Sequence, residues 1–234
     1  MIMNKKMKTT LGMIFLFSSA YGQTTDLGVK ADKENKAIPQ TYFTPIIKLA
    51  SSNLNYGSDN SSVADFKKEL KGIQAGASVQ IGLAPHVSLL TEFYYMRKGG
   101  ILKANNPLTT DETTYKFNTL ELPVLARLHL GRIHVNAGPS VAYYFSGKEK
   151  TTDQTKAISF NKTGDGYRRL KAGIGMGGGY TFPIKQKQFT LDIRYNHGLT
   201  NISHSKEMYN RSIVVSIIAV KRPNSKPATE IGTL

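Results

Sequence analysis

Residues 72–83 read GIQAGASVQIGL, and they decide the fold because apolar side chains alternate there with small or polar ones. Ile73 and Val79 fall on one parity, whereas Gln74 and Gln80 fall on the other. Successive side chains of a β-strand point to opposite faces of its sheet. This period of two therefore predicts a strand with one apolar and one polar face.

The same alternation recurs in seven further segments on either side of this stretch. Together the segments predict eight strands, at 42–54, 72–83, 87–96, 120–130, 133–145, 170–182, 189–197 and 212–219. The first strand is the least regular, because Pro45 removes one hydrogen bond from its ladder. Short turns are expected at 85–86, 131–132 and 184–187. Long polar connections are expected at 55–71, 101–113, 147–166 and 200–210.

The polar parity carries charged residues on most of these strands. They are Lys48, Glu92, Glu121, Arg127, Lys171, Asp192 and Arg194. Acids and bases that share one face predict a closed network of mixed charge built around Arg194, in which the three acids compensate Lys48, Arg127 and Lys171. We favour this structural interpretation over catalytic carboxylates.

Four glycines occupy the charged parity of a single strand. They are Gly173, Gly175, Gly177 and Gly179. Glycine on a solvated face weakens a strand without a gain in packing. Inside a small barrel, by contrast, it leaves volume for long side chains of neighbouring strands. The stripe therefore favours a barrel with its polar face inward and its apolar face outward.

These patterns predict an all-β fold, an eight-stranded antiparallel up-and-down transmembrane β-barrel. Alternating short and long connections are typical of outer-membrane barrels, with the short turns periplasmic and the long loops extracellular. A soluble periplasmic β-barrel, with its apolar face inward around an apolar ligand, remains the alternative. An eight-stranded interior can be filled by side chains, so an open diffusion pore is not expected.

The chain ends differ in composition from the barrel. Residues 1–22 combine a lysine-rich start, a short apolar run and small residues, which predicts a secretory signal peptide cleaved after Ala20 or Gly22. Residues 23–40 are expected to be a flexible periplasmic lead-in, 41–221 the barrel and 222–234 a polar tail. Cleavage removes three lysines and no acid, which lowers the net charge of the 234-residue chain from +15 to +12.

The basic residues concentrate beside the long connections. They are Lys67, Lys68, Lys71, Lys98, Lys103, Lys148, Lys150, Lys156, Lys162, Arg168, Arg169, Lys206 and Arg211. On an exported protein, this charge points to lipopolysaccharide and outer-membrane lipid as partners and argues against nucleic acid. Simple loop solubility explains the same charge equally well. Other envelope or secretion proteins are further candidate partners.

The search for catalytic chemistry yields little. The chain has no cysteine, which excludes disulfides, cysteine zinc sites and a thiol nucleophile. His197 lies near Ser203 and Ser205, so a lipid-modifying outer-membrane enzyme is the weakest alternative. No acid stands at a plausible strand spacing from this pair. We therefore expect no enzyme activity, no cofactor and no metal site.

Several stretches in order resemble the PorT-like outer-membrane β-barrel family of Gram-negative bacteria. They are TEFYYMRKGG at 91–100, LELPVLARLHLG at 120–131, HVNAGPSVAYYF at 134–145 and GIGMGGGYTF at 173–182. The resemblance spans about 41–221. It implies an eight-stranded outer-membrane barrel, with a link to protein secretion for the members that named the family. One departure is the polar tail, where such barrels commonly end in an aromatic residue recognised during assembly.

Overall fold

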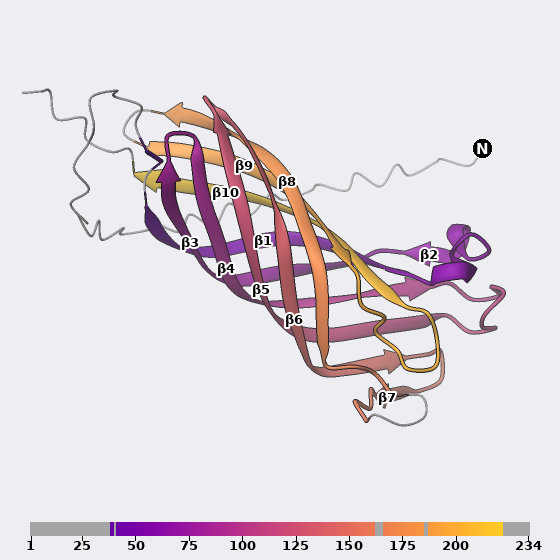
Figure 1. Cartoon of the computed structure of the whole chain (residues 1–234). Helices are drawn as coiled ribbons and strands as arrows, with labels where there is room; N and C mark the ends of the chain where they lie inside the picture. Colours follow the sequence, from indigo (N-terminus) through magenta and orange to yellow (C-terminus); the bar gives the residue numbers. More distant parts are fainter. Residues whose placement is uncertain (1–37, 40, 162–165, 185–186, 222–234) are drawn as a thin grey trace, which may run out of the picture.

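The computed structural model describes residues 38–39, 41–161, 166–184 and 187–221 (Figure 1). The signal peptide expected at 1–22, nearly all of the lead-in and the tail expected at 222–234 lie outside the described residues.

Eight long strands form one antiparallel sheet that closes on itself. They are β1 (Tyr42–Asn55), β3 (Leu70–Ala84), β4 (Val87–Leu102), β5 (Thr113–Leu130), β6 (Ile133–Lys150), β8 (Leu170–Ile184), β9 (Lys187–Gly198) and β10 (Tyr209–Lys221). Each strand pairs with its neighbours along the chain, and β1 pairs with β10 to complete the ring. The expected eight-stranded antiparallel barrel is therefore confirmed.

Four short elements lie between the long strands. They are the strands β2 (Lys67–Lys68) and β7 (Thr155–Ala157) and the 3₁₀ helices η1 (Gly57–Asn60) and η2 (Ala64–Phe66). Among the described residues, neither helix has the length or apolar character that a membrane-crossing helix requires.

The connections sort to the two ends of the barrel. The tight turns at 85–86 and 131–132 lie at one end, called the turn end here. The long connections lie at the opposite end, called the loop end, together with η1, η2, β2 and β7 (Figure 1). This is the alternation of connection lengths that the sequence predicts.

The strands run farther toward the loop end than predicted. β4 continues to Leu102 and β5 begins at Thr113, and these two residues are paired with each other. β6 continues to Lys150, which is paired with Thr114. The predicted strand ends at Met96 and Phe145 and the predicted start at Leu120 were therefore wrong. The backbone N–H and C=O groups of these polar extensions pair with those of a neighbouring strand. Their side chains alternate only weakly between apolar and polar, so the sequence did not indicate this pairing.

Pro45 does not interrupt the first strand. β1 pairs with β3 from Tyr42 to Ser52, and Pro45 lies opposite Ala77. On its other side, β1 pairs with β10 from Leu49 to Asn55. Pro45 thus lies in the part of β1 that has one paired neighbour, where a missing N–H is tolerated.

Exposure alternates along the strands as their parity predicts. Large apolar side chains stand outward on all eight long strands, including Leu49 on β1, Ile73 on β3, Phe93 on β4 and Leu122 on β5. The interior carries polar side chains and a minority of apolar ones. A small apolar cluster lies among them, formed by Ile46, Ala50, Tyr94, Met96 and Val214.

Candidate functional site

Glu92 lies at the centre of an ion-pair network in the barrel interior. Its Oε1 atom lies 2.7 Å from Lys48 Nζ, and Oε2 lies 2.8 Å from a guanidinium nitrogen of Arg194. A second Arg194 nitrogen donates to Oε1 at 3.2 Å, so the guanidinium grips the carboxylate with two bonds. All three side chains are almost completely buried. This geometry is the strong, two-pronged form of arginine recognition.

Asp192 forms the neighbouring centre, toward the turn end. Its Oδ2 accepts from Arg127 at 3.2 Å and from Asn136 at 3.3 Å. His134 Nε2 lies 2.8 Å from the same oxygen. Arg194 reaches Oδ1 at 3.7 Å and so joins this centre to Glu92. Five of the seven charged residues singled out in the sequence therefore lie in one connected group.

The glycine stripe lies alongside this group. Gly177 on β8 is paired with Arg194 on β9. A Cβ atom added to Gly175 would stand 3.7 Å from Arg194 Cδ, and one added to Gly179 would stand 2.5 Å from His134 Cε1. At Gly173 it would meet Ser140 Oγ at 3.0 Å. At Gly173, Gly177 and Gly179 the nearest atom to such a Cβ is a backbone carbonyl oxygen of β9. The space that a side chain on β8 would take is thus occupied by the backbone of β9 and by side chains of neighbouring strands.

Glu121 forms a separate centre nearer the loop end. Lys98 Nζ lies 2.5 Å from its Oε1 atom, and the Lys98 ammonium also stacks over the Tyr144 ring at 5.2 Å. Tyr94 donates to Oε2 at 3.1 Å and Thr119 to Oε1 at 2.9 Å. The expectation that Lys98 adds charge to an exposed loop was wrong. Strand β4 extends past Met96, and Lys98 falls on its inward parity.

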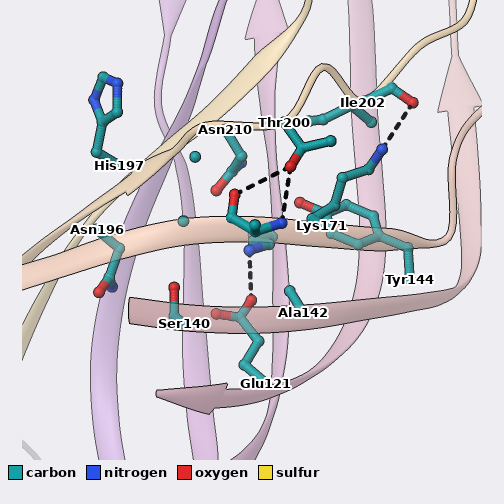
Figure 2. Close-up of a pocket in the computed structure, with 14 residues that line it drawn as sticks. Glu121, Ser140, Ala142, Tyr144, Lys171, Asn196, His197, Thr200, Ile202 and Asn210 are labelled. Atoms are coloured by element: carbon teal, nitrogen blue, oxygen red, sulfur yellow. Dashed lines mark hydrogen bonds and ion pairs between the residues drawn. The ribbon is translucent and has the colours of Figure 1, made fainter. Parts of the chain in front are cut away.

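Lys171 has no acidic partner among the described residues. Its ammonium donates to two loop carbonyls, of Asn201 at 2.8 Å and of Ile202 at 3.4 Å. The expected compensation of Lys171 by an inward acid was therefore wrong, because Lys98 takes Glu121. Both lysines and Glu121 line a cavity of about 30 Å³ (Figure 2).

Above this cavity the loops pack an apolar cluster, here named the cap. It consists of Leu54, Tyr56, Val63, Leu102, Tyr115, Phe117, Ala142, Tyr144, Ile158, Ile202 and Met208. Val63, Ile158 and Ile202 come from three different connections, and they meet side chains from the strand ends. Burial in the cap raises the pKa of the Tyr56 phenol well above its usual value.

Backbone and side-chain hydrogen bonds tie these connections together. Lys103 N donates to Phe66 O at 2.8 Å, and Arg168 N donates to Ile202 O at 2.8 Å. Ser58 N donates to the Glu207 carboxylate at 2.9 Å. The described parts of the loops thus form a structured lid of the barrel.

Comparison with known proteins identifies the family. Residues 45–204 match the model described as "Outer membrane protein beta-barrel domain". The chain belongs to this outer-membrane β-barrel family. Membership agrees with the closed barrel and its apolar outer face, and it places the protein in the outer membrane.

Three bacterial proteins are among the solved structures that are similar to the chain. Ail of Yersinia pestis is 12% identical, with a TM-score of 0.41, covering 75% of this chain and 95% of Ail. Neisserial surface protein A is 10% identical, with a TM-score of 0.45, covering 76% and 96%. The N-terminal barrel of Pseudomonas aeruginosa OprF is 14% identical, with a TM-score of 0.29, covering 72% and 95%. No curated protein matches the chain.

In this outer-membrane barrel, the residues considered for catalysis do not assemble. His197 Nδ1 lies 3.3 Å from the Tyr195 hydroxyl on the same strand. Ser203 and Ser205 hydrogen-bond each other at 3.3 Å, and no hydrogen bond joins either serine to His197 in the described structure. A search of the described residues finds no group of His, Cys, Asp and Glu that could hold a metal ion.

The predicted ion-pair network left out several polar residues whose inward parity the sequence does indicate. Gln74, Gln80 and His134 share the inward parity, and Gln80 accepts from Arg127 at 3.1 Å. The period of two indicates that these residues face inward, but only charged residues were assigned to the predicted network. The cap residues Val63 and Ile158 lie in connections without periodicity, so no sequence signal could have grouped them.

Proposed function

We propose that the protein is a PorT-like member of its family, with a structural, interaction or secretion-accessory role rather than a catalytic one. We also propose that the signal peptide is cleaved on export and that the loop end is extracellular. The observation that carries the proposal is the filled interior. Ion pairs occupy the middle of the barrel and the cap covers its loop end, so the surfaces available to partners lie outside the lumen.

The soluble carrier fits the structure less well. A carrier needs an apolar cavity for its ligand, whereas the cavity beneath the cap is small and is lined by Lys98, Glu121 and Lys171. The apolar side chains stand outward instead, for example Leu49 at 66% exposure and Phe93 at 57%. An outward apolar band matches the hydrocarbon layer of a membrane.

Exposed basic residues on the loop end support lipopolysaccharide as a partner. They include Lys68, Lys71, Lys103, Lys148, Lys150, Lys156, Arg168, Arg169 and Lys206. Cations that flank a membrane-embedded segment attract anionic head groups through an interaction that salt screens. The phosphates of an outer leaflet would supply the counter-charge.

Binding to lipopolysaccharide tests this function directly. The wild-type protein in detergent should bind lipopolysaccharide in a salt-sensitive manner, and Lys148→Gln combined with Lys150→Gln and Lys156→Gln should weaken binding severalfold. Arg132→Gln, in an exposed turn at the opposite end, is the matched control and should bind as the wild type does. Equal weakening by the control, or none in the triple variant, would refute the assignment of the loop end to this partner.

A further inference from the structure

We infer that the cavity beneath the cap binds a small monovalent anion of halide size. The first observation is the balance of buried charge around it. Lys98 and Lys171 line the cavity together with Glu121, and Glu121 is already paired with Lys98. One positive charge is therefore left without a counter-charge, and burying an unpaired charge is costly.

The donors of Lys171 are not exhausted by its protein contacts. An ammonium group carries three donors. Two of them are used on the carbonyl oxygens of Asn201 and Ile202. These carbonyls solvate the ammonium group but do not neutralise it. The third donor is free to meet an anion, since Lys171 has no further polar partner in the described structure.

A second buried donor lines the same cavity. Asn210 on β10 is 6% exposed, and its Nδ2 atom has no hydrogen-bond partner among the described residues. A buried donor without a partner typically destabilises a fold, so a ligand that accepts from it is favoured. Lys171 and Asn210 both line this cavity together with Glu121, and Figure 2 shows the Lys171 ammonium directed toward the Ile202 carbonyl.

The size of the cavity selects the ligand. About 30 Å³ is room for roughly two water molecules. A monatomic halide fits this space, whereas sulfate, with five heavy atoms, is too large. Water would satisfy the donors but leave the charge of Lys171 uncompensated. The Glu121 oxygens are engaged by Lys98, Tyr94 and Thr119, which limits their repulsion of an anion.

The site also couples the barrel to its cap. Lys171 belongs to β8, and the carbonyls that it holds belong to the connection that contributes Ile202 to the cap. An anion that fixes the Lys171 ammonium should therefore stabilise this connection. A ligand that binds only the folded state raises apparent stability in proportion to the logarithm of its concentration.

The experiment follows the thermal unfolding of the full-length protein in detergent, with chloride, bromide, gluconate or sulfate as sodium salts at equal ionic strength. The wild type should show a Tm that rises with chloride and bromide but not with gluconate or sulfate. Lys171→Met and Asn210→Leu should lose this rise, whereas Lys156→Met, which removes an exposed lysine, should keep it. Bromide-soaked crystals of the wild type should show an anomalous peak in this cavity.

A wild-type Tm that is the same in all four salts, with no bromide peak, would overturn the inference, as would an equal halide response in the Lys171 variant. If that variant fails to fold, the bromide peak in the wild type still decides the question. Lipopolysaccharide binding depends on exposed loop residues, so either idea can fail without the other.

Discussion

The middle of the barrel and its loop end are both filled, but by opposite kinds of side chain. In the middle, Glu92 and Asp192 hold Lys48, Arg127 and Arg194 through buried ion pairs. At the loop end, apolar residues from the strand ends and the connections make the cap. The network comes from strands alone, whereas the cap combines strand ends with five residues of the connections. One lumen is therefore closed by two different kinds of packing.

The two regions should also respond differently to damage. A buried ion pair that loses one partner leaves a charge that cannot be solvated. An apolar cluster that loses a side chain loses the packing contacts of that side chain. Loops around the resulting cavity can relax, which limits the cost in stability. Loss of a network residue should therefore unfold the whole barrel more easily, while loss of a cap residue should act locally.

Glu92→Ala is expected to have the largest effect. It removes the carboxylate shared by Lys48 and Arg194 and leaves two buried cations close together, at a cost of about 3–5 kcal/mol. Heat-modifiable gel mobility and denaturant unfolding in detergent would measure it. Glu112→Ala, at an exposed position, is the control and should change stability little. Similar midpoints for the two variants would show that the network is not needed for stability.

Ile202→Ala should have the next largest effect, at about 2–4 kcal/mol, because its side chain is almost fully buried in the cap. The loss should appear in amide hydrogen exchange of the loops, with a smaller change in barrel unfolding. Leu199→Ala, in the same connection but exposed, should leave exchange unchanged. Faster exchange along β1 and β9, equal to that in the loops, would contradict the independence of the two regions.

Gly177→Ala should have the smallest effect of the three, about 1–3 kcal/mol. Its new Cβ would stand 2.3 Å from the carbonyl oxygen of Ile193, so the backbone must move. Gly175→Ala is the matched control, because the atoms near its Cβ all belong to side chains, the nearest at 3.0 Å. Comparison of their unfolding midpoints checks this. A control variant less stable than Gly177→Ala would be inconsistent with the observed packing.

The sequence was sufficient for the part of the molecule with a period of two. That period gave the eight strands and their inward faces, because each inward side chain follows from its neighbours two residues away. The inward position of Lys98 was not predicted, because the predicted strand ended at Met96. Had the period been extended by one step, Lys98 would have been placed inside.

The partners of the inward residues could not be predicted in the same way. Which acid meets which base depends on the register between strands, and Glu121 is paired with Lys98 rather than with Lys171. The cap depends on contacts between connections far apart in the chain, such as Phe66 with Lys103. Neither leaves a local pattern, so only the assembled barrel reveals them.

Recording of ion conduction across planar lipid bilayers would show whether the lumen is closed. Purified wild-type protein, shown to be folded by its heat-modifiable mobility, would be inserted and recorded under applied voltage. Because ion pairs fill the middle and the cap covers the loop end, no stable conductance steps are expected. Reproducible steps of uniform size from the folded wild type would contradict this expectation and would mean that the interior is an open channel.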